Sequence, residues 1–276
     1  MAPKSLVSTD WIAENIDDPN ICLIEIDRDG VSAYQSGHIP GALGWHWKSS
    51  LWDPLERQFP TSEDFAERLG AAGIGNETIV VFYGEPVQFG TYAWWVFKNM
   101  GHDDVRILDG GGVKWREEGR PISKSVPRVQ RTEYRPSVRN DSIKVGRDDV
   151  LRQLEASDCR ILDHRSVEEY LGERVAPLDM HDSGAERHGR IPGALSIPFD
   201  TLLNENTTFK SPDHLRQITS AKTSGFDQKI ISYCRLSHRA SLACFAMTEI
   251  LDYSNVSVYD GSWTEWGSMV GVPIER

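Results

Sequence analysis

Residues 229–266, KIISYCRLSHRASLACFAMTEILDYSNVSVYDGSWTEW, follow the order apolar strand, loop, helical run and second apolar strand. Residues 78–115, TIVVFYGEPVQFGTYAWWVFKNMGHDDVRILDGGGVKW, follow the same order. Short β-branched runs that alternate with longer segments of helical period are typical of an α/β fold with a mainly parallel sheet flanked by helices. The two stretches therefore predict the same fold unit, present twice.

Other signals also repeat, in the same order along the chain. The matched pairs are HIPGAL at 38–43 with RIPGAL at 190–195, CLIEIDRDGVSAY at 22–34 with CRILDHRSVEEY at 159–170, and Gly-x-Pro-Ile at 119–122 and at 271–274. By subtraction, the pairs that start at 38 and 190, at 78 and 229 and at 119 and 271 lie 151 or 152 residues apart. One nearly fixed offset across several features indicates a duplication.

The duplication sets the expected domain organisation. We predict one domain over residues 1–122 and a second over residues 143–276. The segment between them, residues 123–142, is polar, contains prolines and shows no clear period. Such a composition predicts a linker.

Composition narrows the class of protein. The chain has 276 residues, 39% of them hydrophobic, and a formal net charge of −11. A net negative charge argues against nucleic-acid and anionic-membrane partners. No apolar run approaches the roughly 20 residues of a membrane span, and the first residues lack the apolar stretch of a signal peptide. We therefore expect a cytoplasmic protein with a packed core.

The four cysteines form no Cys-x-x-Cys pair, which argues against a zinc site or a dithiol redox motif. A cysteine is more often a small buried hydrophobe than a nucleophile. Cys22 and Cys159 border strand-like runs and Cys244 lies in a helical run. We interpret these three as structural and expect no metal.

The fourth cysteine has different surroundings. Cys234 ends the strand-like run KIISY, and Arg235, His238 and Arg239 follow it before a helical run that starts near Arg239 or Ala240. In open α/β sheets, ligands bind beyond the carboxyl ends of the strands. Loop N–H groups, a helix N-terminus and nearby cations favour an anion and a thiolate there. The alternative is a buried cysteine whose arginines are merely solvated.

The first half lacks this set of residues. Gly84 stands where Cys234 stands, the arginines are missing, and Glu85 brings the opposite charge. The duplicated fold therefore does not need the cysteine. We infer one active domain and one catalytically silent domain.

The tandem domains, the HIPGAL and RIPGAL turns, the YCRLSHR loop and the YDGSWTEW segment resemble the rhodanese superfamily. More narrowly, the chain is similar to bacterial tandem-domain thiosulfate sulfurtransferases, from about Val7 to Pro273. The resemblance implies two rhodanese-like domains and a catalytic Cys234 that carries sulfur as a persulfide. It also implies that no metal or organic cofactor is required.

The resemblance further implies which residues form the binding site. Backbone N–H groups of the loop, which includes Leu236, Ser237 and His238, would cradle the transferred sulfur. Arg235 and Arg239 would hold an anionic donor, and Arg165 would face the same pocket. Arg187 or Arg190, just before the second turn, would be a further donor ligand. The acceptor would be cyanide, a small thiol or a sulfur-accepting protein.

The loop composition bears on the identity of the donor. Mercaptopyruvate enzymes of this family carry Cys-Gly-[Ser/Ala]-Gly-Val-[Thr/Ala], whereas this chain carries Cys-Arg-Leu-Ser-His-Arg. The added positive charge favours thiosulfate, with 3-mercaptopyruvate as the alternative. Two positions depart from the family pattern, because Ser237 replaces a glycine and Arg190 replaces a histidine.

Two other classes of function remain as alternatives. Some rhodanese-like proteins hydrolyse phosphoesters with a Cys-x5-Arg loop, but the spacing here is Cys-x4-Arg. A shorter loop suits a single sulfur anion better than a tetrahedral phosphate. The remaining alternative is a binding module or a sulfur relay that acts only with a protein partner.

Overall fold

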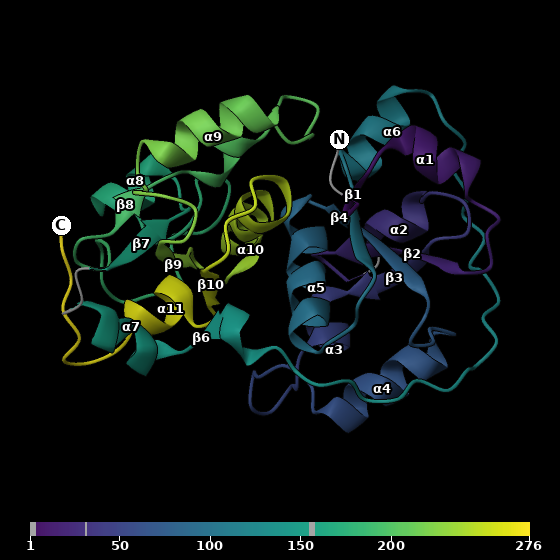
Figure 1. The fold of residues 1–276 in the computed structure, drawn as a ribbon, viewed down its shortest axis with the longest axis horizontal. Coiled ribbons are helices and arrows are strands. Elements are labelled where there is room, and N and C mark those ends of the chain that lie inside the picture. Colours follow the sequence, from purple (N-terminus) through teal and green to yellow (C-terminus); the bar gives the residue numbers. More distant parts are fainter. Residues whose placement is uncertain (1–3, 31, 155–157) are drawn as a thin grey trace. The chain divides into compact units, whose positions relative to one another are not determined.

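The computed structural model describes residues 4–30, 32–154 and 158–276, and it separates into two compact units (Figure 1). The first unit contains the described residues up to Asn140 together with Glu205–Thr208. The second unit contains Asp141–Asn204 and Phe209–Arg276. Each unit holds one five-stranded parallel sheet with helices packed on it, which confirms the predicted fold class.

The sheet of the first unit has the strand order β1-β5-β4-β2-β3. Its strands are β1 Leu6–Val7, β2 Ile21–Asp27, β3 Leu43–His46, β4 Ile79–Glu85 and β5 Val105–Leu108. The helices of this unit are α1 Thr9–Glu14, α2 Ser32–Ser36, α3 Trp47–Leu51, α4 Ser62–Ala71, α5 Gln88–Asn99 and α6 Gly111–Glu117.

The sheet of the second unit has the equivalent order β6-β10-β9-β7-β8. Its strands are β6 Lys144–Val145, β7 Cys159–Asp163, β8 Leu195–Ser196, β9 Lys229–Tyr233 and β10 Val256–Tyr259. The helices of this unit are α7 Arg147–Leu154, α8 Val167–Leu171, α9 Pro212–Ser220, α10 His238–Phe245 and α11 Ser262–Trp266, with 3₁₀ turns at Asp141–Ile143 and Phe199–Leu202 and a π-helical turn at Ala246–Ile250. Within the described residues, every helix is too short or too polar to cross a lipid bilayer.

The repeated turns are held by the same bond in both units. The backbone N–H of Ile39 donates to the hydroxyl of Tyr83 (3.2 Å), and that of Ile191 donates to the hydroxyl of Tyr233 (3.3 Å). Each tyrosine lies at or near the carboxyl end of the central strand, β4 or β9. Each IPGAL turn is therefore hydrogen-bonded to the central strand of its own sheet, which gives the repeated motif the same structural role in both units.

The closing segments also repeat in detail. Trp115 and Trp266 are buried, and their indole N–H groups donate to the carbonyl oxygens of Pro121 (2.7 Å) and Pro273 (2.9 Å). Each Gly-x-Pro-Ile segment thus contributes the acceptor for a buried tryptophan. The duplication inferred from the sequence extends to individual hydrogen bonds.

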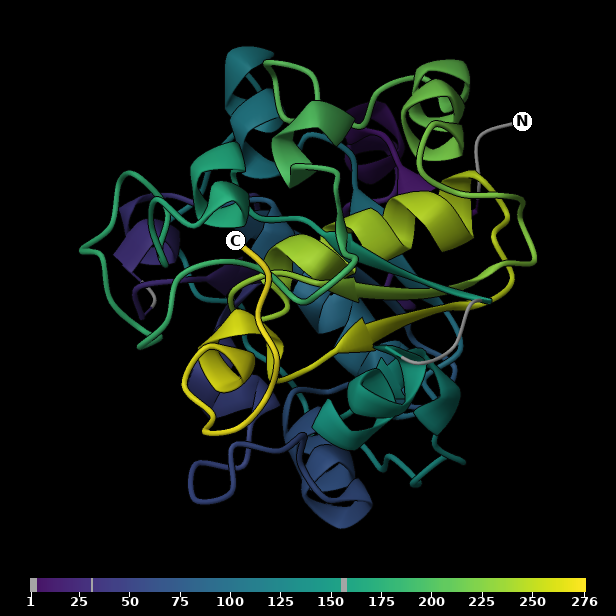
Figure 2. The ribbon, with the colours of Figure 1, turned by 90° about the vertical axis from the view of Figure 1, so that its left-hand side faces the viewer.

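The helix after the central strand packs against its own sheet. In the second unit α10 contacts β9 and β10, and Figure 2 shows it lying along these strands. In the first unit α5 contacts β4, β5 and β2. The helix α5 is followed by Gly101 at φ +82°, a left-handed conformation that ends helices and that glycine adopts without steric cost.

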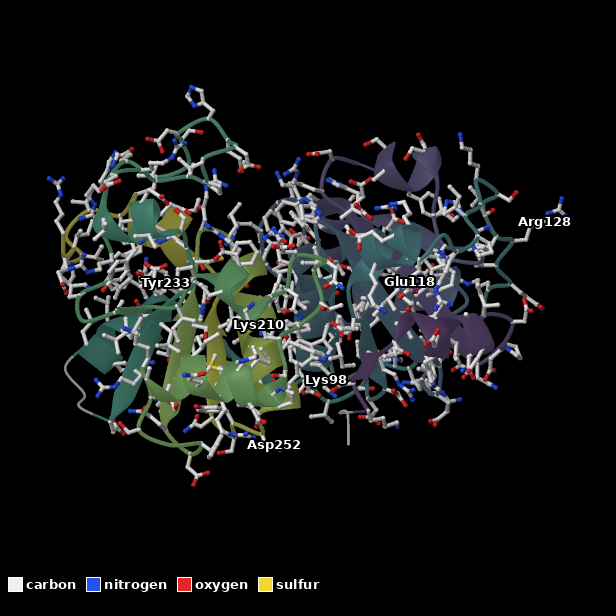
Figure 3. All side chains as sticks on the ribbon, turned by 90° about the horizontal axis from the view of Figure 1, so that it is seen from above. Lys98, Glu118, Arg128, Lys210, Tyr233 and Asp252 are labelled. Atoms are coloured by element: carbon white, nitrogen blue, oxygen red, sulfur yellow. The ribbon has the colours of Figure 1, made fainter. Side chains whose placement is uncertain are left out.

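The predicted linker at 123–142 has no strand or helix until its end, where the 3₁₀ turn begins. Parts of it pack on the first unit: the N–H of Thr132 donates to the carbonyl of Gly70 (3.0 Å), and the hydroxyl of Tyr134 contacts His102 (3.1 Å). Other side chains, such as that of Arg128, project away from the ribbon (Figure 3). The segment is therefore extended but bonded along part of its length.

Both sheets have a buried carboxylate at an equivalent position, but only the one in the second unit is followed by an arginine that pairs with it. In the second unit, Asp163 at the end of β7 is followed two residues later by Arg165, which pairs with it (2.7 Å). In the first unit the equivalent residues are Glu25 and Asp27, so the arginine is missing. Burial raises the pKa of Glu25 to about 7, and the nearby carboxylates of Glu85 and Asp27 add to the effect, while the charge of Arg116 opposes it. Neither carboxylate oxygen of Glu25 has a hydrogen-bond partner among the described residues.

This difference predicts a pH-dependent stability for Glu25→Gln. A carboxyl group whose pKa is raised in the folded state binds its proton more tightly there, so stability falls as pH rises from about 4.5 to about 7. Gln cannot ionise and avoids this loss, which amounts to on the order of 3 kcal/mol. We expect the variant to gain free energy of unfolding over the wild type near pH 8 and to show little gain near pH 4.

Urea unfolding at the two pH values measures this difference. Glu77→Gln, at an exposed position of the same unit, removes the same charge and serves as the control. A gain for Glu25→Gln that is equal at both pH values would contradict the assignment.

Candidate active site

Cys234 lies between the end of β9 and the start of α10, beyond the carboxyl end of a strand, as expected, and that strand is the central one of its sheet. The helix begins at His238, one residue earlier than the sequence suggested. Two bonds tie the cysteine backbone to α11: its N–H donates to the hydroxyl of Ser262 (3.2 Å), and its carbonyl accepts from the N–H of Trp263 (2.9 Å). Cys234 itself is 1% exposed.

The loop presents open backbone donors. In the part of the chain that the structure describes, the N–H groups of Arg235, Leu236, Ser237, Arg239 and Ala240 have no hydrogen-bond acceptor. These groups surround the N-terminus of α10, where the helix dipole favours negative charge. The loop therefore has the features of an anion site directly after a thiol.

The structure shows how a serine can occupy position 237, where the family pattern has glycine. Ser237 adopts φ +69°, a left-handed conformation that is costly for residues with a Cβ atom. Its buried hydroxyl donates to the carbonyl of Asp260 (2.6 Å) and lies near that of Tyr259 (3.3 Å). The loop thus turns as a glycine would allow, and the serine hydroxyl fastens the turn to the end of β10.

A second serine carries similar strain. Ser262 has φ +51°, and its hydroxyl donates to the carbonyl of Tyr259 (2.8 Å) while accepting from the N–H of Cys234. The equivalent residue of the first unit is Gly111, at φ +52°. Unusual backbone conformations on both sides of the cysteine are typical of functional sites.

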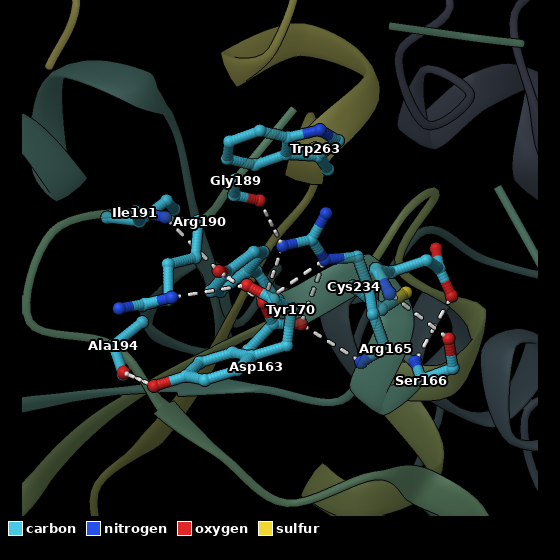
Figure 4. A network of polar contacts seen from close by, with 12 residues as sticks. Asp163, Arg165, Ser166, Tyr170, Gly189, Arg190, Ile191, Ala194, Cys234 and Trp263 are labelled. Atoms are coloured by element: carbon cyan, nitrogen blue, oxygen red, sulfur yellow. Dashed lines mark hydrogen bonds and ion pairs between the residues drawn. The ribbon is translucent and has the colours of Figure 1, made fainter. Parts of the chain in front are cut away.

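Arg165 is fully buried, and Figure 4 shows its polar contacts. It donates to both carboxylate oxygens of Asp163 (2.7 to 3.1 Å) and to the carbonyl of Gly189 (2.8 Å), and its guanidinium lies over the ring of Trp263 at 4.4 Å. Burial disfavours its charge, but the charge and hydrogen bonds of Asp163, with smaller contributions from Tyr233 and Glu169, together raise the pKa of Arg165. Its Nη1 atom has no hydrogen-bond partner among the described residues.

Arg239 is also paired with a buried carboxylate. Its Nη1 and Nη2 atoms donate to the two carboxylate oxygens of Glu169, at 2.6 and 2.9 Å. Burial opposes the charge, yet the hydrogen bonds to Glu169 raise the pKa of Arg239 above its usual value. Glu169 comes from α8, so this pair joins the first turns of two helices.

Arg235 has a different environment. Its Nη2 atom donates to the carbonyl of Ser183 (3.0 Å), and its Nε atom has no partner. Among the described residues it forms no ion pair with a carboxylate. Burial, and then the charge of Arg239, lower the pKa of Arg235. A guanidinium in this state is the cation of the loop best able to take an anionic partner.

The structure places Arg187 and Arg190 against the C-terminal segment. Arg187 donates to the carbonyls of Trp266 (2.7 Å), Val272 (3.0 Å) and Gly267 (3.2 Å). The side chain of Arg190 forms an ion pair with Glu275, and the backbones of the same two residues form an antiparallel bridge. Neither side chain contacts the residues at 234–239 in the described structure, so their role as donor ligands stays a prediction.

The remaining predicted residues lie in the loop itself. Leu236 is partly exposed and His238 is buried at the first position of α10. Leu236 and His238 lie close to Cys234 because they follow it by two and four residues in the same loop.

The equivalent loop of the first unit has no room for a nucleophile. A Cβ atom on Gly84 would meet the backbone N atom of Gly90 and the carbonyl oxygen of Pro86, the latter at 2.6 Å. Where the second unit has Trp263, the first has Gly112, and the ion pair between Glu85 and Arg116 occupies the space beside it. The first unit therefore has no room for a side chain where the second has Cys234, and its lack of catalytic activity stays a prediction.

The other thiols are poorly suited to chemistry. Burial raises the pKa of Cys22 and of Cys244 to about 12, and it also raises that of Cys159. Within the described ranges, no group of three or more His, Cys, Asp or Glu side chains is arranged to hold a metal ion.

Sequence reasoning missed several residues around the loop: Asp163, Glu169, Tyr233, Ser262 and Trp263. The motif Ser-x-x-Glu at 166–169 does form a capping box at the start of α8. That signal would have identified the position of Glu169 on the helix, but not its ion pair with a residue 70 positions later.

Substitutions at Ser237 separate its backbone strain from its hydrogen bond. Ser237→Gly loses the bond but relieves the strain, whereas Ser237→Ala loses the bond and keeps the strain. We expect Ser237→Ala to be the least stable of the three proteins, by on the order of 1 kcal/mol relative to Ser237→Gly. Thermal unfolding measures the order, and an alanine variant as stable as the glycine variant would refute the assignment.

Comparison with known proteins gives a consistent result. The family model for the rhodanese-like domain matches twice, over residues 8–118 and 147–269. The sulfur carrier protein TtuD of Thermus thermophilus is 42% identical over 99% of this chain and 97% of its own length. A protein of Saccharopolyspora erythraea, provisionally named thiosulfate sulfurtransferase, is 41% identical over 98% of this chain and 96% of its own.

Solved structures agree with this assignment. The anaerobic ergothioneine biosynthesis enzyme of Chlorobium limicola, in complex with trimethyl histidine, has a TM-score of 0.87 and 25% identity over 99% of this chain and 70% of its own. A complex of EanB with hercynine has a TM-score of 0.88 and 26% identity, over 99% of this chain and 69% of its own. With two matched domains that cover most of its length, this chain belongs to the rhodanese family of sulfurtransferases.

Proposed function

We propose that this protein is a thiosulfate sulfurtransferase in which Cys234 carries the sulfur as a persulfide. The observation that carries the proposal is the placement of Cys234 on a loop with open N–H groups beside Arg235, an arginine without a carboxylate partner in the described structure. The first unit offers no such thiol, because Gly84 has no room for a side chain.

The first half-reaction forms a bond between Cys234 and the donor. Thiosulfate is a dianion, and Arg235 attracts it to the loop. The thiolate attacks the outer sulfur atom, the sulfur–sulfur bond of the donor breaks, and its electron pair leaves on sulfite. Charge and electrons balance without an oxidant. The resulting persulfide anion lies where the backbone N–H groups of the loop can donate to it.

The second half-reaction returns the enzyme to its resting state. A cyanide ion or a thiolate attacks the terminal sulfur of the persulfide, and the thiolate of Cys234 is the leaving group. The residues of the chain supply nucleophile, anion binding and positioning. We propose that the donor site comprises Arg235, Leu236, Ser237, His238 and Arg239, together with Arg165.

The charge of the loop supports thiosulfate over 3-mercaptopyruvate as donor. An uncompensated guanidinium favours the donor with the greater negative charge. The same geometry counts against a phosphatase, because Glu169 already occupies the two terminal nitrogens of Arg239. A phosphatase of the Cys-x5-Arg type needs that arginine for the phosphoryl oxygens.

A second candidate function, that of a sulfur carrier, depends on whether the sulfur acceptor is a small molecule or a protein. The similarity to a protein named as a sulfur carrier favours a protein acceptor as an alternative to a small molecule. A carrier of that kind would load sulfur on Cys234 but turn over slowly until its partner is added. Steady-state turnover with thiosulfate and cyanide alone separates the two functions.

Two substitutions test the proposal. Cys234→Ser should reduce sulfur transfer from thiosulfate to cyanide by at least about a thousandfold, since it removes the nucleophile. Arg235→Gly should reduce kcat/KM for thiosulfate by roughly tenfold to a hundredfold, because a charge-assisted hydrogen bond is lost. It should affect 3-mercaptopyruvate, with its single negative charge, less.

Arg160→Gly provides a matched control, since it removes an arginine on β7 outside the loop. Activity retained in Cys234→Ser, or thiosulfate use unchanged in Arg235→Gly, would count against the proposal.

A further inference from the structure

The arginines around Cys234 differ in whether a carboxylate compensates their charge. Arg165 is paired with Asp163, and Arg239 is paired with Glu169. Arg235 donates to a neutral carbonyl oxygen. Each buried ion pair has a net charge of zero, so the guanidinium of Arg235 is left to determine the sign of the pocket.

We propose that Glu169 is a positioning residue that holds Arg239 and cancels its charge, and so limits the positive charge that Cys234 and its donor experience. Glu169 has not been among the residues expected at the site. Its effect on the donor rests on the function proposed above, but its effect on the charge at Cys234 does not.

The contacts of Glu169 fix its carboxylate firmly. The side chain is fully buried, and both oxygens accept from Arg239. One of these oxygens also accepts from the N–H of Ser166 (3.1 Å), whose hydroxyl in turn accepts from the N–H of Glu169 (3.3 Å). The capping box at the start of α8 thus orients the carboxylate that orients Arg239.

The charges in question act on one another. The thiolate of Cys234 raises, and the charge of Arg165 lowers, the proton affinity of Arg239, and Glu169 favours the charged forms of both Arg235 and Arg165. Among the described residues, Asp163 faces Arg165 as its counter-charge, and His238 adds an imidazole at the first position of α10. Removing the charge of Glu169 would therefore be felt at Cys234.

The ion pair determines whether Arg239 can bind an anion. With Glu169 in place, Arg239 cannot turn both terminal nitrogens to a bound anion. Without its charge, Arg239 becomes a second uncompensated cation beside Arg235, so the pocket becomes one unit more positive. A dianionic donor then gains more affinity than a monoanionic donor does.

The charge at Cys234 can be measured without any sulfur donor. Alkylation by iodoacetate, an anion, is compared with alkylation by neutral iodoacetamide, and peptide mass spectrometry follows Cys234. The ratio of the two rates cancels the nucleophilicity of the thiol and reports local charge. We expect Glu169→Gln to raise this ratio about tenfold, the effect of one unit charge at roughly 10 Å and an effective dielectric of about 20.

A second variant guards against misfolding, because Glu169→Gln leaves a buried guanidinium without its counter-charge. The double variant Glu169→Gln/Arg239→Gln removes both charges of the pair. Its ratio should equal that of the wild type, whereas Arg235→Gln should lower the ratio about tenfold. Glu168→Gln, on the same helix but outside the ion pair, is the matched control and should leave the ratio unchanged.

Donor kinetics complete the test. In Glu169→Gln the KM for thiosulfate should fall relative to that for a monoanionic thiosulfonate donor by about the same factor, and Glu169→Asp should restore the preference of the wild type. An unchanged alkylation ratio in Glu169→Gln, or a lowered ratio in the double variant, would overturn the role of Glu169. A shifted ratio without sulfur transfer in any variant would instead overturn the proposed function and leave the role of Glu169 standing.

Discussion

The hydroxyl of Tyr233 holds together the parts of the second unit that form the candidate site. It donates to the buried carboxylate of Asp163 at 2.5 Å and accepts from the N–H of Ile191 in the repeated turn. Asp163 in turn fixes Arg165, and Arg165 lies against Trp263, whose N–H donates to the carbonyl of Cys234. The buried hydroxyl of Tyr233, the residue before Cys234, therefore connects the repeated turn, the end of β7 and the loop that carries the thiol. Its burial, together with the adjacent Asp163, raises the pKa of Tyr233, so the hydroxyl keeps its proton and remains a donor.

The first unit shows which of these features belong to the fold and which to the chemistry. Tyr83 keeps its bond to the turn, and Glu25 keeps a carboxylate at the end of β2. Arg165, Cys234 and Trp263 are replaced by Asp27, Gly84 and Gly112. The tyrosine and the turn thus serve the sheet in both units, whereas the thiol, its arginines and the tryptophan are present in one. With Asp27 in place of the arginine, burial dominates the pKa of Glu25, and the charge of Arg116 opposes it only weakly.

The sequence was sufficient to predict the duplication, the parallel α/β fold and the position of Cys234 at the end of a strand, because these depend on local periodicity and on one repeat. It was not sufficient for the interactions that assign charge. Glu169 and Arg239 lie 70 residues apart, as do Asp163 and Tyr233. Arg187 and Arg190 were expected near a donor, but a C-terminal segment about 80 residues later provides their partners. Ser237 could be recognised as unusual from the family pattern, while the carbonyl groups that stabilise it come from the end of another strand.

In the proposed reaction, sulfur is carried by one cysteine, Cys234 of the second unit. The most direct measurement is peptide mass spectrometry of the protein after incubation with thiosulfate and digestion without a reductant. We expect one added sulfur atom on the peptide that contains Cys234, and none on the peptides with Cys22, Cys159 or Cys244. An unmodified Cys234 peptide, or added sulfur on another cysteine in its place, would contradict the account.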